Sequence, residues 1–166
     1  FTTEVGVDLV SLGGTKIGAL AAEAVIVTNA STPRGKELAE AMPYLRKTSM
    51  QLASKMRFFS AQLNALFEND AALALANAKK ANGMAQKLYA EIVEIAKHHS
   101  EISLPNVAEA NAVFPILPQK ITEALQAQYR FYVWNQATGQ VRLMCSWDTE
   151  EEDVDGLVGL LRELIS

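Results

Sequence analysis

The chain has 166 residues, of which 49% are hydrophobic and 20% charged, and its formal net charge is −4. These totals indicate a globular protein with a sizeable core, and the acidic balance argues against nucleic-acid binding, which needs a basic surface. The lone cysteine, Cys145, excludes an internal disulfide and favours the cytoplasm, and no apolar run is long enough to cross a membrane.

Two apolar runs, residues 7–12 and 22–28, flank a glycine-rich turn near the amino terminus. Near-continuous apolar runs predict strands covered on both faces, as in a parallel or mixed sheet. The turn contains Lys16, whose charged ammonium group would be unfavourable inside a buried strand. Two interpretations stay open: a strand-end lysine that reaches solvent, or a nucleophilic amine held in a dry pocket to form a Schiff base.

Helical periodicity begins after a loop at residues 29–35. Apolar residues spaced by three and four from Leu45 to Leu66 predict one long helix that Pro43 starts or kinks. Residues 68–70 predict a break, and a second long helix follows to about Lys97.

The last third of the chain alternates between short strands and helices. Residues 111–117 predict a strand, 118–126 a short helix, and 131–134 with 141–147 a hairpin. Thr149 and Glu152 have the spacing of a capping box that opens a final helix. The elements together predict an α/β fold that ends in a small α+β unit.

Two arginines stand out from the surface pattern. Arg57 ends a stretch, residues 34–57, that is basic within an acidic chain, and arginine binds phosphate through two parallel hydrogen bonds. Arg142 lies in VRLMCSW, where alternation places it on the face opposite Val141, Leu143 and Cys145. A solvated helix arginine and an exposed strand arginine are the plainer interpretations of the two. The pair His98 and His99 fits a helix end, and no metal-ligand spacing surrounds it.

Four segments in the same order resemble the low-specificity threonine aldolases, a family of pyridoxal-phosphate enzymes in the β-eliminating lyase group. The segments are SLGGTKIGALAAEAVIV, YLRKTSMQLASKMRFFSAQ, EANAVFPILP and VRLMCSWDTEEEDVD. The resemblance implies the carboxy-terminal part of an α/β, transferase-like (fold type I) enzyme. It implies the end of the large cofactor-binding domain at residues 1–35, a long connecting helix at 36–69 and a small α+β domain at 70–166.

The resemblance also implies roles for particular residues. Lys16 matches the lysine that binds the cofactor as a Schiff base, and Thr15 beside it matches a residue that holds the cofactor phosphate. Arg57 matches an arginine that reaches this phosphate, often in the neighbouring subunit, and Arg142 matches the arginine that binds the substrate's α-carboxylate. Members often carry asparagine directly after this lysine, where this chain has Ile17. The difference does not affect the Schiff base, but isoleucine cannot take a polar role at this position.

The implied activity is cleavage of threonine, allo-threonine or similar β-hydroxy amino acids to glycine and an aldehyde. Fifteen residues precede Lys16, whereas the family's ring-stacking and pyridine-nitrogen residues lie further upstream. We therefore expect this chain to be inactive unless it pairs with the amino-terminal half of the same enzyme, within a homodimer or homotetramer. The alternatives are a related lyase that eliminates a β-substituent and a non-catalytic helical interaction module.

Overall fold

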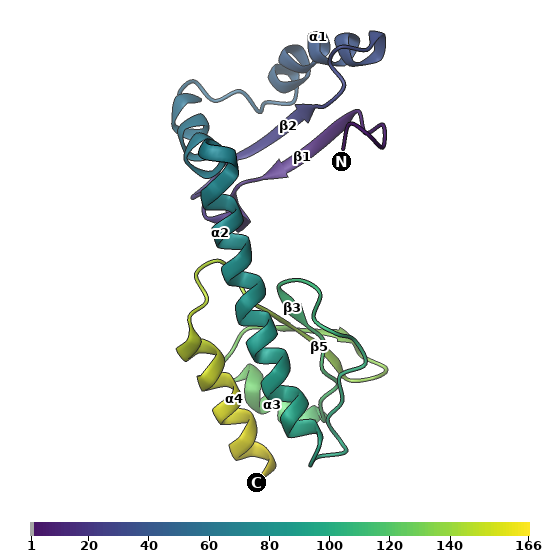
Figure 1. The fold of residues 1–166 in the computed structure, drawn as a ribbon, viewed down its shortest axis with the longest axis vertical. Helices are drawn as coiled ribbons and strands as arrows, with labels where there is room; N and C mark the ends of the chain where they lie inside the picture. The colour runs from purple at the N-terminus through teal and green to yellow at the C-terminus, as the bar shows by residue number, and fades with distance from the viewer. Residues whose placement is uncertain (1) are drawn as a thin grey trace. The chain divides into compact units, whose positions relative to one another are not determined.

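The structure is a computed structural model that describes residues 2–166. The chain divides after Ala74 into two compact units, which are described separately. Figure 1 shows the elements along the chain. They are β1 (Leu9–Gly13), a 3₁₀ turn (Thr15–Ile17), β2 (Glu23–Val27), α1 (Pro33–Thr48), α2 (Arg57–Ala96), β3 (Ala112–Val113), α3 (Gln119–Gln126), β4 (Tyr132–Asn135), β5 (Gln140–Met144) and α4 (Glu151–Ile165).

In the first unit, β1 and β2 form an antiparallel pair in register from Leu9 opposite Val27 to Gly13 opposite Glu23. Both predicted strands are confirmed. The expectation that they are covered on both faces is wrong for the described residues, because Val25 is 59% exposed and Ile26 41% exposed. A two-stranded ribbon has two open faces, and the rest of this unit does not bury them.

The single helix predicted from Leu45 to Leu66 is wrong. Helix α1 ends at Thr48, with Pro43 inside it, and α2 begins only at Arg57. The N–H of Gln51 donates to the Arg46 carbonyl at 2.9 Å and that of Met50 to the Lys47 carbonyl at 3.1 Å. These two bonds form a Schellman motif, in which Met50 takes the left-handed conformation (φ 56°) that glycine usually occupies. No glycine marks this ending, and the apolar residues keep their helical spacing across it. The sequence pattern therefore does not reveal where α1 ends.

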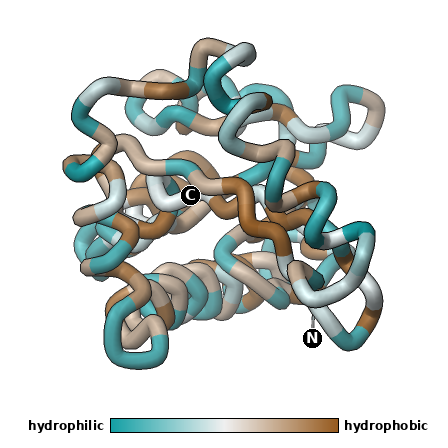
Figure 2. The backbone as a smooth tube through the Cα atoms, turned by 90° about the horizontal axis from the view of Figure 1, so that it is seen from above, coloured by the Kyte–Doolittle hydropathy of each residue, from teal (hydrophilic) through white to brown (hydrophobic). Residues whose placement is uncertain are grey.

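The predicted break near residues 68–70 is confirmed. Glu68 has an extended ψ of 156°, and the next three residues have positive φ, so α2 consists of two helical stretches joined by a kink. The second stretch contributes its apolar stripe to the second unit. Along the helical turns in Figure 2, brown and teal segments alternate, as expected for helices with one apolar face.

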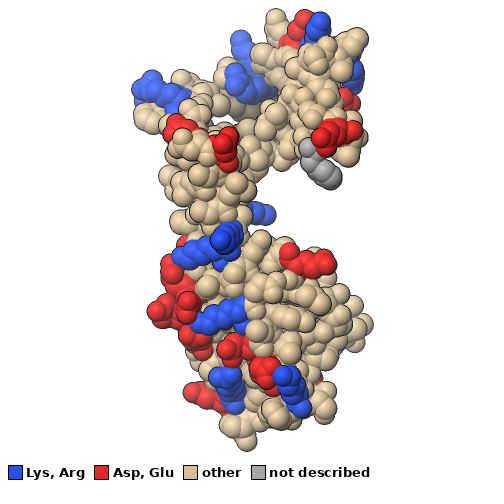
Figure 3. Space-filling view, viewed as in Figure 1, with Lys and Arg blue, Asp and Glu red and all other residues tan. Residues whose placement is uncertain are grey.

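The second unit is an antiparallel sheet in the order β3-β5-β4, packed with α2, α3 and α4 around one hydrophobic core. The hairpin, the short helix α3 and the final helix are confirmed. The residues with the largest fully buried side chains come from all layers: Ile92, Ile102, Val113, Pro115, Leu125, Val141 and Leu161. At the surface, a basic residue of α2 pairs with an acid of α4, with 2.8 Å between Lys87 Nζ and Asp155 Oδ1. Figure 3 shows basic and acidic side chains next to one another on the surface of this unit.

Two further expectations for this unit are corrected. The strand predicted at residues 111–117 is reduced to the two residues of β3, because Pro115 has no N–H for a continuous ladder. The capping box of α4 pairs Glu150 with Asp153, not Thr149 with Glu152. The Thr149 hydroxyl is already engaged, since it accepts a hydrogen bond from the Ser146 N–H at 2.8 Å.

Candidate active site

Lys16 lies in the 3₁₀ turn between β1 and β2, and its side chain is exposed in the described chain. The turn is held closed by three backbone bonds: the Gly14 N–H donates to the Ala22 carbonyl at 2.8 Å, and the Gly14 carbonyl accepts from Ile17 and Ala19. The amine is therefore accessible to a ligand. The dry pocket that Schiff-base chemistry requires is not formed by residues 2–166.

The Thr15 hydroxyl donates a hydrogen bond to Glu23 Oε1 at 2.8 Å. The same carboxylate covers Gly13, because a Cβ on that glycine would lie 2.9 Å from Glu23 Oε2. Glu23 is a site residue that sequence reasoning missed, and the available signal was an acid inside an otherwise apolar strand. It matters because Thr15 has one proton to donate, so a phosphate that binds this hydroxyl competes with Glu23.

The segment after Lys16 is hydrogen bonded to helix α2. The backbone N–H groups of Leu20 and Ala21 both donate to Gln62 Oε1, at 2.8 and 3.2 Å. Gly14 permits this close approach, since a Cβ there would lie 2.6 Å from the Ala22 carbonyl oxygen and 3.0 Å from Leu63 Cδ2. Helix α2 therefore positions the lysine turn from one side.

A cavity of about 380 Å³ opens beside this turn within the first unit. Thr15 and Glu23 line one side of it. The other side comes from the segment between α1 and α2 and from the start of α2: Met50, Gln51, Leu52, Ala53, Met56 and Phe59. Lys16 and Arg57 are not part of the lining, but each directly follows a residue that is.

Arg57 is the first residue of α2, and its side chain is exposed. Its guanidinium carbon lies 4.9 Å from the centre of the Phe58 ring. Among the described residues, no carboxylate lies within ion-pair distance of it. The guanidinium edge is therefore open to an anion.

Arg142 belongs to the second unit, whereas Lys16, Thr15 and Arg57 belong to the first. It lies on β5, the central strand and not an edge strand of its sheet. The predicted alternation is confirmed: Val141 is 0% exposed and Leu143 3%, and Arg142 occupies the opposite face. Its guanidinium carbon lies 5.5 Å from the centre of the Trp134 ring.

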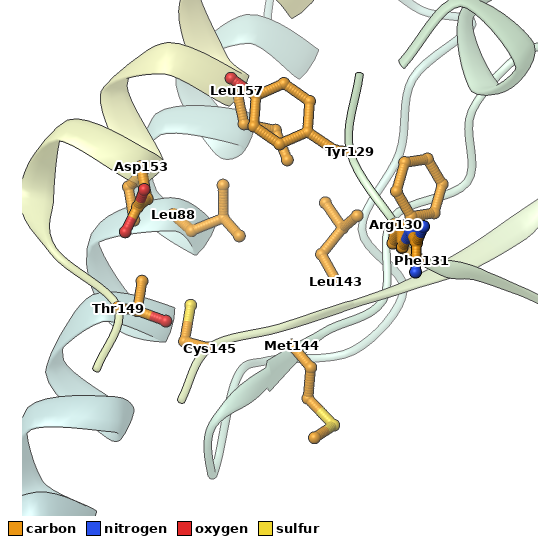
Figure 4. Close-up of a pocket in the computed structure, with 11 residues that line it drawn as sticks. Leu88, Tyr129, Arg130, Phe131, Leu143, Met144, Cys145, Thr149, Asp153 and Leu157 are labelled. Carbon is orange, nitrogen blue, oxygen red and sulfur yellow. The ribbon is translucent and has the colours of Figure 1, made fainter. Parts of the chain in front are cut away.

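A second cavity, of about 250 Å³, lies in the second unit between α2, α4 and the sheet (Figure 4). Leu88, Leu143 and Cys145 point toward it, whereas Met144 points away. Burial raises the pKa of the Cys145 thiol, which disfavours the thiolate and makes this cysteine a poor nucleophile. Its lining combines core residues such as Leu88 and Leu143 with the exposed Arg130 and Asp153.

The described residues offer neither a cluster of metal ligands nor a membrane-spanning helix. Within residues 2–166, no three His, Cys, Asp or Glu side chains lie together as metal ligands would. His99 Nδ1 lies 3.5 Å from Glu101 Oε1, beyond the end of α2. None of the described helices has the length and apolar character needed to cross a membrane.

Comparisons with known proteins relate this architecture to one class. The fold matches the solved structure of the threonine aldolase of Leishmania major with a TM-score of 0.76 and 26% sequence identity, over 96% of this chain and 44% of that chain. The chain is therefore a mixed α/β part of a fold type I enzyme architecture, as expected from the sequence.

The sequence relatives are more specific. The chain is 39% identical over 166 residues to the low specificity L-threonine aldolase of Pseudomonas sp. and 39% identical over 158 residues to that of Pseudomonas aeruginosa. It spans 44% of the first relative's length and 42% of the second's. No family model matches the chain. The resemblance to the low specificity L-threonine aldolases is confirmed over 99% of this chain.

Proposed function

We propose that this chain is part of a pyridoxal-phosphate-dependent carbon–carbon lyase that cleaves threonine, allo-threonine and similar β-hydroxy amino acids to glycine and an aldehyde. The observation that carries the proposal is the 39% identity to a low specificity L-threonine aldolase over 99% of this chain. Because the chain spans 44% of that relative, the activity requires the remaining part, the amino-terminal half. We place the assembled enzyme in the cytoplasm, as a homodimer or homotetramer.

The donor groups of the chain fit the cofactor. An exposed primary amine, Lys16, suits its aldehyde, and the open guanidinium of Arg57 and the hydroxyl of Thr15 suit its phosphate. The cavity beside the lysine turn supplies room next to Thr15. The one feature that opposes phosphate is the Glu23 carboxylate, which holds the Thr15 proton. Thr15 therefore binds phosphate only after it rotates away from Glu23.

Each residue then has a definite task. Lys16 binds the cofactor aldehyde through its amine, while Thr15 and Arg57 hold the phosphate. Arg142 binds the α-carboxylate of the amino acid and so fixes the orientation of the bond to be broken. When bound, pyridoxal phosphate supplies an electron sink for the electron pair that remains on the α-carbon.

The proposed domain division is the one that the resemblance implies. Residues 1–35 form the end of the large domain, 36–69 the connection and 70–166 the small domain. Two observations support it: the lysine turn and its strands lie in the first unit, and the core of the second unit is continuous. The connection contains two helical segments and not one.

The test is made on the enzyme that contains this chain together with its amino-terminal half. We expect Lys16→Ala to abolish both the visible absorbance of the bound cofactor and the release of acetaldehyde from threonine. Borohydride reduction followed by peptide mapping should place the modified lysine at position 16. The matched control is Lys36→Ala, an exposed lysine on α1 that should change neither readout.

Two results would contradict the proposal. The first is a reduced, cofactor-bearing peptide that contains another lysine of the chain. The second is a product analysis in which β-substituted amino acids are consumed by elimination but threonine gives no glycine.

A further inference from the structure

Between two neighbouring matched pairs of the hairpin, strand β4 has one residue more than strand β5. Val133 lies opposite Val141 and Asn135 lies opposite Gln140, so Trp134 has no partner across the hairpin. This is a β-bulge, which redirects the side chain of the extra residue. Trp134 alternates with Val133, which lies opposite the buried Val141, so its indole lies on the exposed face of the sheet together with Tyr132 and Arg142.

Trp134 contacts both Phe114 and Arg142. The Phe114 ring packs edge-on against the indole, with ring centres 5.4 Å apart and planes at 65°. The guanidinium carbon of Arg142 lies 5.5 Å from the centre of the Trp134 ring, within the range of a cation–π contact. Three side chains from β4, β5 and the segment after β3 thus form the stack Phe114–Trp134–Arg142.

The two aromatic rings do not neutralise the positive charge of Arg142. Its other close contact is the weak acceptor Sδ of Met144, and no carboxylate forms an ion pair with it in the part of the chain that the structure describes. Trp134 remains 57% exposed, so the face of the stack is open. Apart from the contact with Met144, the guanidinium N–H groups therefore remain available to a carboxylate.

We propose that Trp134 is a positioning residue for Arg142: the indole, braced by Phe114, holds the guanidinium so that its N–H edge receives the α-carboxylate of the amino acid substrate. This inference rests on the proposed function, in which Arg142 binds that carboxylate. A flexible arginine loses side-chain freedom when it binds, and a guanidinium that is already held loses less. The indole therefore contributes to substrate affinity without touching the substrate.

The experiment uses the assembled enzyme loaded with its cofactor and four variants: Trp134→Leu, Trp134→Phe, Arg142→Lys and the control Trp147→Leu. Trp147 is the other tryptophan of the chain, is 37% exposed and lies outside the stack. We expect Trp134→Leu to raise the KM for threonine roughly three- to tenfold with little change in kcat, because a cation–π contact of this size is lost. Trp134→Phe retains a ring and should recover part of the affinity, and Trp147→Leu should not change it.

A binding readout separates positioning from folding. The dissociation constant of glycine should rise in Trp134→Leu, whereas that of ethylamine, which lacks the carboxylate, should stay unchanged. In the double variant Trp134→Leu/Arg142→Lys, the tryptophan change should have no further effect.

Three outcomes overturn the inference and are distinguishable. If Arg142→Lys weakens glycine binding but Trp134→Leu does not, Arg142 keeps its proposed role and Trp134 does not position it. If Arg142→Lys leaves glycine binding unchanged, the carboxylate role of Arg142 fails, and the inference about Trp134 fails with it. Equal weakening of glycine and ethylamine by Trp134→Leu would show a general structural effect and would also overturn it.

Discussion

Cys145 follows β5 directly and continues its inward-facing row, so its thiol is 3% exposed. Burial raises its pKa above the ordinary value of 9.0, because a thiolate would lose its hydration there. The folded state therefore keeps a proton at a pH where the unfolded chain releases it. This contribution to stability is complete below pH 9 and declines as the pH rises toward the pKa of the folded state.

We predict that the free energy of unfolding falls above about pH 9 by up to roughly 1.4 kcal/mol per pH unit from this group. Urea unfolding of this chain between pH 7 and 10.5 would measure the slope. Cys145→Ala removes the titrating group, so the difference between the two slopes isolates it from lysines and tyrosines. Identical slopes in the two proteins would contradict the prediction.

The hydrogen bond between Thr15 and Glu23 affects the phosphate-binding role that the resemblance implies for Thr15. In sequence, a threonine beside the lysine of a glycine-rich turn indicates a phosphate ligand by resemblance. In the structure, its hydroxyl proton is donated to Glu23 at 2.8 Å. The acid comes from the opposite strand of the hairpin, and the register that places it there is a tertiary property.

At the scale of elements, helix α4 begins with a reciprocal cap. The Glu150 side chain accepts from the backbone of Asp153, and Asp153 Oδ2 accepts from the Glu150 N–H at 2.9 Å. Glu152 lies in the same turn and is equally acidic, but it takes no part in the cap. Both acids interact favourably with the helix dipole, so only the cap distinguishes them.

We predict that Asp153→Ala lowers the free energy of unfolding by about 1 kcal/mol, because one backbone N–H loses its acceptor. The matched control Glu152→Ala removes the same charge from the same turn and should cost about 0.5 kcal/mol or less. Urea unfolding monitored by circular dichroism measures both. Equal effects would mean that charge and not the cap determines the stability of this turn.

The ending of α1 shows why the long-helix prediction was wrong. Its apolar residues keep helical spacing beyond Thr48, and the usual stop signal, glycine, is absent. Met50 adopts the left-handed conformation instead, and two backbone bonds close the turn. The ending places Met50 at the cavity beside Thr15, which a continuous helix would not do.

At the scale of the whole chain, the two units differ in how much core they contain. Of the buried apolar residues among those that the structure describes, three lie in the first unit: Ala22, Leu66 and Ala74. Large apolar side chains of that unit remain open, including Leu20 at 89% and Met50 at 85% exposed. The second unit has a continuous core across α2, the sheet, α3 and α4. Since burial of apolar surface is the main source of stability, the second unit is the more stable by itself.

We predict that hydrogen exchange of this chain alone is uneven. Amides around Ile92 and Leu161 should exchange at least about a hundredfold more slowly than those of β1 and β2, because local opening is easiest where few apolar contacts are buried. Adding the amino-terminal half should slow exchange in β1 and β2 and leave the second unit unchanged. Mass spectrometry of peptic fragments measures this, and equal protection of both units without the partner would contradict the prediction.

Much of the element order follows from sequence, because local chemistry decides it. Alternating apolar residues mark β5, and helical spacing marks α4 and the later part of α2, so these were predicted within a few residues. The lysine turn was also recognisable from its glycines. Shorter or mixed signals failed: β3 is interrupted by Pro115, and the cap of α4 shifted by one residue because Thr149 was already hydrogen bonded.

The sequence by itself determined most of the order of the elements through residue type and spacing, which are local properties. Through its resemblance to the low-specificity threonine aldolases it also indicated the fold class and the candidates Lys16, Thr15, Arg57 and Arg142. Only the tertiary structure decided what these residues contact. Glu23 reaches Thr15 through strand register, Gln62 binds the segment after the lysine turn from α2, and Trp134 meets Arg142 across the β4–β5 hairpin. Each contact joins segments that are distant along the chain or shifted in register, and the free energy of such pairings depends on packing that no local pattern encodes.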